Sequence, residues 1–398
     1  MIKHPSGTWK SFSLYHRYQE HFILEYQQQS SKHSGLQLDV RQQQLRRWLV
    51  AIFEQLGIDL DHDWTLSPVS GDASFRRYFR VHSHNLSWIA VDAPADKEDS
   101  APFVAIAQAW EPLEIHAPQV HYADLELGFM LLSDLGDTLY LDQLDPSDSS
   151  TADRLYPQAM QTLTHIQQCK SILGERLPAY DRAMLLREME LFREWFLGQQ
   201  LQMTLTGYEQ KMIDSLFDSL IESAQAQPQV CVHRDYHSRN LMIIDGSLPG
   251  VIDFQDAVHG PITYDLVSLL RDCYIAWPEA DVRRWALSYA EQAAQAGLME
   301  AVSSTRFLGW FDRMGMQRHI KVLGIFSRLN IRDGKADYLA DIPCTLKYLQ
   351  QVSSSYPEYQ EFSRWLEQRL VPEMENSGLF DLSLLLPAEQ GDTSEGDR

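Results

Sequence analysis

The stretch that decides the fold reads His233-Arg-Asp-Tyr-His-Ser-Arg-Asn240, and Ile252-Asp-Phe254 follows it a short way along the chain. Apolar runs that read as short strands flank this loop, at residues 230–232, 241–244 and 250–252. The order strand, loop, strand, turn, strand places the polar side chains of both motifs at strand ends. We therefore expect these side chains to meet at one site.

Three of these side chains have the chemistry that phosphoryl transfer from a nucleotide requires. The Asp235 carboxylate can orient an attacking hydroxyl and take its proton late in the reaction. Asn240 offers an amide oxygen and Asp253 a carboxylate, and hard oxygen ligands of this kind hold Mg²⁺. The spacing fits the pattern H-R-D-x-x-x-x-N with a later D-F. Asp253 alone would read as an ordinary turn residue, so the prediction depends on loop, asparagine offset and second aspartate occurring together.

Composition limits the class of protein. The chain has 398 residues, of which 44% are hydrophobic and 22% charged, as in ordinary globular proteins with room for two lobes. Its formal charge of −21 argues against nucleic acid as a partner, because phosphates would be repelled over most of the surface. No apolar run approaches the ~20 residues that span a bilayer, and residues 1–5 lack signal-peptide features. The four scattered cysteines favour thiols in a reducing compartment. We expect a cytoplasmic monomer without a membrane partner.

The pattern along the chain predicts two lobes. Residues 1–40 and the acidic tail at 388–398 are expected to be poorly ordered. Residues 41–135 read as a small lobe, in which a helix ending near Gly57 precedes a strand-rich region and a short helix. Residues 136–387 read as a mostly helical large lobe. The expected strands cover 64–70, 77–82, 87–92, 119–123 and 128–133. The expected helices cover 101–110, 151–173, 181–202, 209–226, 265–274, 279–297, 307–328 and 357–370.

The residues after the loop carry a resemblance to a known family. They read Ile252-Asp-Phe-Gln-Asp-Ala257, then Gly260-Pro261 and Tyr264-Asp-Leu266. This run is similar to the signature of the aminoglycoside phosphotransferase and choline-kinase-like family, and the resemblance covers about residues 64–350. It implies an α+β, protein-kinase-like fold with a small β-rich N-lobe and a larger, mostly helical C-lobe. It also implies ATP and Mg²⁺ as cofactors, a small-molecule acceptor, and a structural role for Asp265.

A second string narrows the resemblance. Ser70-Gly-Asp-Ala-Ser-Phe-Arg-Arg-Tyr-Phe-Arg-Val81 resembles the bacterial cell-wall-sugar kinases that phosphorylate N-acetylmuramate and N-acetylglucosamine at the anomeric position. The segments at 91–94, 132–136, 317–326 and 332–343 are similar to the same subfamily. The resemblance implies a sugar 1-phosphate product and a place in peptidoglycan recycling.

Two segments are expected to bind the nucleotide. The first turns between two strands and offers backbone N–H groups to phosphate, at Gly71, Asp72, Ala73, Ser74 and Phe75. An ordinary hairpin turn explains that segment equally well from local sequence. The second segment joins the lobes and is expected to contact adenine, at Ser133, Asp134 and Leu135.

One position departs from the kinase pattern. Asp92 stands where the third strand of a kinase carries a phosphate-binding Lys. A carboxylate there would repel phosphate, so another cation has to compensate. Arg76, Arg77, Arg80 and Lys97 are the nearby candidates, and strand alternation sends Arg77 to the opposite face from Arg76 and Arg80.

The acceptor side is expected to involve a late helix. Arg318, Lys321 and Arg328 are separated by intervals of three and seven residues and so share a face, where they can bind the carboxylate of N-acetylmuramate. Asp272 can bind sugar hydroxyls. Surface ion pairs explain these residues as well.

Two rival functions stay open. One is an aminoglycoside or choline-type kinase, which needs carboxylates around a cationic acceptor. The other is a catalytically inactive nucleotide-binding regulatory module, suggested by the missing Lys. The combination of Asp235, Asn240 and Asp253 argues against that module.

Overall fold

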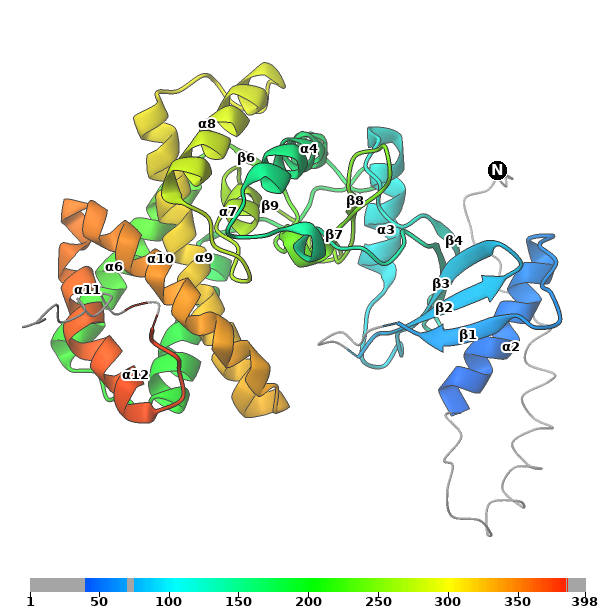
Figure 1. Cartoon of the computed structure of the whole chain (residues 1–398), viewed down its shortest axis with the longest axis horizontal. Coiled ribbons are helices and arrows are strands. Elements are labelled where there is room, and N and C mark those ends of the chain that lie inside the picture. The colour runs from blue at the N-terminus through cyan, green and yellow to red at the C-terminus, as the bar shows by residue number, and fades with distance from the viewer. Residues whose placement is uncertain (1–39, 70–74, 384, 386–398) are drawn as a thin grey trace, which may run out of the picture.

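The computed structural model describes residues 40–69, 75–383 and 385. It forms a small lobe built on one antiparallel sheet and a large helical lobe, which lie side by side in Figure 1. The expected α+β, two-lobe architecture is confirmed. The expectations for the N-terminal extension, the acidic tail and Gly71–Ser74 fall outside the described residues.

The small lobe contains a five-stranded sheet in the order β1-β2-β3-β5-β4. Its strands are β1 (Thr65–Pro68), β2 (Arg77–Ser83), β3 (Leu86–Asp92), β4 (Val120–Asp124) and β5 (Phe129–Ser133). Neighbouring strands pair antiparallel, with Arg77 opposite Asp92 and Ala90 opposite Leu131. All five expected strands occur, with ends shifted by up to two residues.

Helix α2 (Val40–Gln55) covers one face of this sheet, as Figure 1 shows. Its buried residues repeat at helical spacing and pack on β2, β3 and β5. The helix ends before Gly57, whose φ of +69° is a left-handed conformation that glycine adopts without strain. Strand alternation places Phe79, Val81, Trp88 and Ala90 on this face.

Helix α3 (Ala101–Trp110) lies between the sheet and the large lobe. The ring of Phe103 stacks on Phe254 with 4.6 Å between centroids, and Trp110 lies 5.1 Å from the same ring. Phe254 directly follows Asp253. Because α3, Val91 and Met130 share one core cluster with the large lobe, the small lobe is packed onto the segment that carries Asp253.

The large lobe consists mainly of helices. They are α4 (Ser150–Gln167), α5 (Arg182–Leu191), the π-helix η3 (Phe192–Gln200), α6 (Gly207–Gln225), α7 (Tyr264–Leu270), α8 (Glu279–Gln295), α9 (Ser304–Asp333), α10 (Ile342–Ser355), α11 (Gln360–Trp365), the π-helix η7 (Leu366–Leu370) and α12 (Val371–Ser377). The described residues also form short 3₁₀ turns η1 (Glu111–Leu113), η2 (Leu141–Gln143), η4 (Ser238–Asn240), η5 (Ala336–Asp341) and η6 (Pro357–Tyr359).

Helix α9 is the centre of this lobe and packs against α5, α6, α7, α8 and α10. It is thirty residues long and longer than the expected 307–328, because Ser303 caps its start and Gly334 ends it with φ +69°. Eighteen of its residues are buried, among them Arg318 and Lys321. It therefore carries polar side chains into the interior beside the 233–240 loop.

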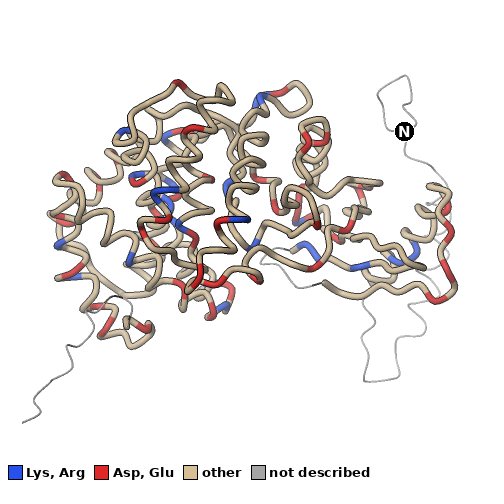
Figure 2. The backbone as a smooth tube through the Cα atoms, turned by 45° about the horizontal axis from the view of Figure 1, so that its top comes forward, with Lys and Arg blue, Asp and Glu red and all other residues tan. Residues whose placement is uncertain are grey.

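Two small sheets hold that loop. One pairs β6 (Gln229–Val232) with β9 (Val258–Pro261), and the other pairs β7 (Leu241–Met242) with β8 (Gly250–Val251). The three strands expected around the loop occur, whereas β9, α10 and α12 were not expected from the sequence. Figure 2 shows acidic positions along both lobes and several basic positions in the middle of the large lobe. Among the described residues, no helix is long and apolar enough to cross a membrane.

Candidate active site

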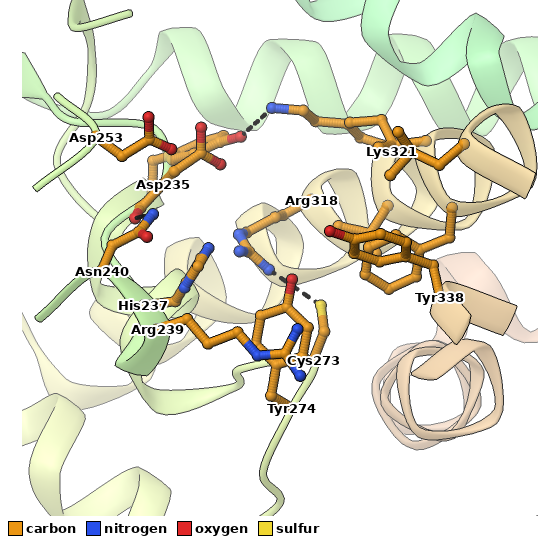
Figure 3. A pocket seen from close by; sticks show the side chains of 15 residues that line it. Asp235, His237, Arg239, Asn240, Asp253, Cys273, Tyr274, Arg318, Lys321 and Tyr338 are labelled. Atoms are coloured by element: carbon orange, nitrogen blue, oxygen red, sulfur yellow. Dashed lines mark hydrogen bonds between the residues drawn. The ribbon is translucent and has the colours of Figure 1, made fainter. Parts of the chain in front are cut away.

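A cavity of about 270 Å³ lies beside the 233–240 loop, near the lower end of the range for small-molecule sites. It brings together Asp235, Asn240 and Asp253 from the two sequence motifs with Arg318 and Lys321 from α9. Figure 3 shows these side chains facing one another. The remaining lining residues are His237, Arg239, Tyr264, Cys273, Tyr274, Val322, Ile325, Phe326, Leu329 and Tyr338.

Asp265, at the start of α7, holds the loop through hydrogen bonds to the loop backbone. Its two carboxylate oxygens accept the backbone N–H of His233 at 2.7 Å and of Arg234 at 3.0 Å. Arg234 has φ +80°, a conformation that non-glycine residues seldom adopt. The structure thus gives Asp265 the supporting role that the family resemblance implied.

His233 links the loop to the second motif. Burial lowers the pKa of its ring to about 4, so the ring is neutral. Its Nε2 lies 3.1 Å from the carbonyl oxygen of Ile252, and the N–H of Asp235 donates to Nδ1 at 3.2 Å. One imidazole therefore fixes the distance between the strand before Asp253 and the loop that carries Asp235.

The side chains of Asn240 and Asp253 are oriented by hydrogen bonds of their own. The Asn240 amide nitrogen donates to the backbone oxygen of Asp235 at 2.9 Å, which leaves the amide oxygen as its remaining acceptor. Gln255 donates to one oxygen of Asp253 at 2.7 Å. Asp253 has φ +64°, which turns it sharply out of β8. Both residues present oxygen ligands to the same cavity.

The charge of Asp235 depends on basic side chains of α9 and of its own loop. Burial opposes its ionisation, but Lys321, His237 and Arg318 outweigh burial and hold the pKa of the carboxyl below its ordinary value. A carboxylate that is ionised can accept a proton from a hydroxyl. Asp235 is accordingly in the form that a base requires.

A buried acid, Glu188 on α5, was missed by the sequence reasoning. It pairs with Arg234, lies 3.4 Å from Lys321 Nζ and accepts a hydrogen bond from the Tyr180 hydroxyl. Lys321 also donates to the Tyr264 hydroxyl at 2.9 Å. The signal in the sequence was an acid at a core position of α5, three residues after the buried Leu185 and four before the buried Phe192.

Asp272 lies behind the loop rather than along the cavity wall. It is fully buried and accepts the backbone N–H of Ser238 at 3.0 Å and of Tyr274 at 3.2 Å. The Ser238 hydroxyl donates to it as well. These bonds position the loop, and sugar binding by Asp272 stays a prediction.

The segment between the lobes is tied to β2 by Arg80. Its guanidinium contacts the Asp134 carboxylate at 2.7 Å, the Gly136 carbonyl at 3.0 Å and the Asp137 carboxylate. Ser133 exchanges hydrogen bonds with Gln119, the residue directly before β4. Nucleotide contacts by Ser133, Asp134 and Leu135 stay a prediction, as do those of Phe75, whose side chain is 61% exposed.

The expectation about Asp92 needs correction. Asp92 is fully buried on the α2 face of the sheet, where Nε of Arg41 and Nε of Arg77 each lie 3.1 Å from a different carboxylate oxygen. Alternation along β3 turns Val91, and not Asp92, toward the large lobe. The carboxylate therefore does not oppose a phosphate in the cleft, and Arg77 is no longer a candidate to compensate for it.

The other candidate cations have partners in the small lobe. Arg76 is buried, with its guanidinium 3.5 Å from Glu98, and Lys97 lies over the ring of Phe75 at 4.8 Å. Glu98 also accepts the N–H of Phe75 at 3.1 Å. Glu98 thus links the end of the expected phosphate loop to the start of α3.

The chain is similar to known proteins along most of its length. Residues 65–303 match the model of the phosphotransferase enzyme family. An N-acetylmuramate/N-acetylglucosamine kinase of Pseudomonas putida is 43% identical over 83% of this chain and 97% of its own length. A protein of the same name from Neisseria meningitidis is 42% identical over 80% of this chain and 92% of its own length.

Solved structures show the same fold at low sequence identity. A Plasmodium vivax ethanolamine kinase superposes with a TM-score of 0.57 at 11% identity, covering 90% of this chain and 98% of that one. The ADP-bound aminoglycoside phosphotransferase APH(2'')-Ib superposes with a TM-score of 0.51 at 16% identity, covering 79% of this chain and 99% of that one. With the family match and the close relatives, we conclude that the chain is an enzyme that belongs to the phosphotransferase enzyme family.

Proposed function

We propose that this enzyme transfers the γ-phosphoryl group of ATP to the anomeric hydroxyl of N-acetylmuramate and of N-acetylglucosamine. The observation that carries the proposal is the cavity in which Asp235 faces Arg318 and Lys321 of α9. The relatives that share most of the chain bear the name of kinases for these two sugars. The product, a sugar 1-phosphate, suits a later nucleotidyl transfer in peptidoglycan recycling.

Asp235 acts in this proposal as the base that orients the acceptor. An anomeric hydroxyl is more acidic than an ordinary alcohol, so a weak carboxylate base is sufficient. The base takes the proton late, because phosphoryl transfer depends mainly on positioning and charge neutralisation. The hydrogen bonds of Asp265 and His233 keep the Asp235 backbone in place during this step.

Asn240 and Asp253 are proposed to hold Mg²⁺. Their donor set fits the ion, because Mg²⁺ is bound through one or two protein oxygens with phosphate and water completing its shell. When bound, the ion would neutralise charge on the phosphates.

The nucleotide is proposed to bind between the lobes. Ser133, Asp134 and Leu135 would meet adenine, and Gly71, Asp72, Ala73, Ser74 and Phe75 would meet phosphate. The support is the kinase-like fold together with the position of β5, which leads into the large lobe at Ser133. A cytoplasmic, monomeric enzyme is part of the proposal, and the free state of all four cysteines is consistent with a reducing compartment.

The rival acceptors fit the cavity less well. An aminoglycoside or choline acceptor is cationic and needs carboxylates around it. Here the carboxylates among the described lining residues are Asp235 and Asp253, both at the transfer end. The opposite wall carries arginines and aromatic rings. An inactive regulatory module is disfavoured because the three polar groups of the two motifs meet in one cavity.

The test is ATP consumption with four acceptors in parallel: N-acetylmuramate, N-acetylglucosamine, choline and kanamycin. We expect turnover with the two sugars only, and loss of most of it in D235N with ATP affinity retained. Turnover with kanamycin or choline alone would contradict the acceptor assignment. Stoichiometric ATP binding without turnover on the whole panel would instead support the regulatory module.

A further inference from the structure

Arg318 is a buried cation whose hydrogen-bond partner is a thiol and not a carboxylate. Its side chain lies on α9 and is only 4% exposed. Its guanidinium donates to the thiol sulfur of Cys273 at 3.4 Å. Burial raises the pKa of that thiol, so the sulfur stays neutral. Among the residues that the structure describes, no carboxylate oxygen lies within 4 Å of the Arg318 guanidinium.

The same region pairs its other buried cations. Lys321 lies 3.4 Å from Glu188, and Arg234 pairs with that same acid. Arg271 contacts Asp312 at 2.8 Å and Glu279 at 2.9 Å. Arg318 differs from these cations, because Asp235 and Asp272 act on it only at longer range, and a buried charge is costly when no anion contacts it. The guanidinium of Arg318 faces the cavity, where an anion can reach it.

The position of Arg318 favours an anion on the acceptor over the transferred phosphoryl group. Figure 3 shows its guanidinium between the carboxylates of Asp235 and Asp253 on one side and the rings of Tyr274 and Tyr338 on the other. The metal ligands face the first side. The aromatic rings form the side on which a sugar ring can stack. The ring centroids of Phe326 and Tyr338 lie 5.2 Å apart on that side.

We infer that Arg318 binds the lactyl carboxylate of N-acetylmuramate and so sets the preference of the site for the acidic sugar over neutral N-acetylglucosamine. This inference rests on the proposed function. The inference requires that, with the anomeric hydroxyl at Asp235, the substituent on the third carbon of the same ring reaches Arg318. Arg318 then pairs with a carboxylate that the chain itself does not provide. Lys321 is already paired with Glu188, and it lowers the pKa of Asp235 together with Arg318.

The experiment compares wild type, R318M and R318K with three acceptors: N-acetylmuramate, its methyl ester and N-acetylglucosamine. R306M is the matched control, since Arg306 is an exposed arginine twelve residues earlier on α9, about 18 Å away along the helix. We expect the ratio of kcat/KM for the acid to that for N-acetylglucosamine to fall roughly 30-fold or more in R318M, mostly through KM. The ratio for R318K should lie between those of wild type and R318M, and R306M should keep the wild-type ratio.

The methyl ester distinguishes the two anions that Arg318 could bind, which are the carboxylate of the acceptor and the transferred phosphoryl group. In wild type, changing the acid to the ester should cost about as much as R318M costs the acid, and in R318M the same change should cost little. An equal loss for both sugars in R318M would assign Arg318 to the phosphoryl group or to the charge of Asp235, and either assignment would overturn the inference. An unchanged ratio would overturn it as well. If wild type phosphorylated neither sugar, the proposed function itself would fail and the inference with it.

Discussion

The carboxylate of Asp265 accepts the backbone N–H of His233 at 2.7 Å, and its second oxygen accepts that of Arg234 at 3.0 Å. The two bonds hold the loop in a conformation that includes a positive φ at Arg234. Asp265 does not line the cavity, yet the placement of Asp235 depends on it. The catalytic geometry is therefore set from the interior of the large lobe.

Asp265→Asn is expected to lower kcat about 100-fold while the KM for ATP changes little. The amide supplies one acceptor and one donor, so one backbone N–H loses its partner and the loop shifts, and displacements near 1 Å cost this much. Steady-state kinetics measures the effect. Asp281→Asn is the control, because Asp281 pairs with Arg284 on the surface of α8. A wild-type kcat in Asp265→Asn would contradict the role of this residue.

Asp92→Asn is expected to reduce the free energy of unfolding by about 2 kcal/mol and to leave the KM for ATP within twofold. Breaking a buried ion pair costs 3–5 kcal/mol, and the partly exposed Arg41 and Arg77 reduce that figure here. Urea unfolding measures the change. Asp218→Asn, in the exposed pair with Arg182, should cost less than about 1 kcal/mol. A large rise in the KM for ATP at unchanged stability would show that Asp92 acts at the nucleotide site and contradict the correction.

Gly324→Ala is expected to destabilise the protein by about 1–3 kcal/mol through overpacking of α9. A Cβ at Gly324 would lie 2.3 Å from the backbone carbon of Leu191, which cannot move aside freely. Gly309→Ala, on the same helix, meets only the end of the Arg313 side chain and should be neutral or stabilising. Thermal unfolding compares the two. Equal melting temperatures would contradict the close packing of α9 on the end of α5.

His319→Gln is expected to make the free energy of unfolding fall less steeply as the pH is lowered. Burial, with Arg318 nearby, lowers the pKa of His319 to about 3, whereas an unfolded histidine titrates near 6.5. Between these values the unfolded chain binds a proton that the folded chain does not, so stability falls as the pH drops through this window. Removing the ring should reduce the slope by up to ~1.4 kcal/mol per pH unit. Urea unfolding at several pH values from 7 downward measures it, and an unchanged slope would refute the assignment.

The sequence predicted the loop and its neighbourhood because both are local. The motif residues 233–240 and 252–254 are close along the chain, so spacing alone indicated that Asp235, Asn240 and Asp253 would meet. Hydrophobic periodicity located α2 and α3 for the same reason. Arg318 and Lys321 were placed at the site through a resemblance, and the structure brings both to the cavity.

What the sequence did not predict depends on distant contacts. Glu188 became visible only when α5 and the loop were seen together, and β9 forms because it pairs with β6 across the loop. Asp92 was misjudged because its place in a motif was weighed more heavily than strand alternation. Trp88, Ala90 and Asp92 share one face, and two of the three were already evident core residues.

The position of the new phosphate ester tests the central claim most directly. The enzyme is incubated with ATP, Mg²⁺ and N-acetylglucosamine, and phosphorus-coupled NMR of the product shows which carbon carries the phosphate. We predict coupling of phosphorus to the proton on the anomeric carbon, and no product from the 1-deoxy sugar. Phosphate on any other hydroxyl, or turnover of the 1-deoxy sugar, would contradict it.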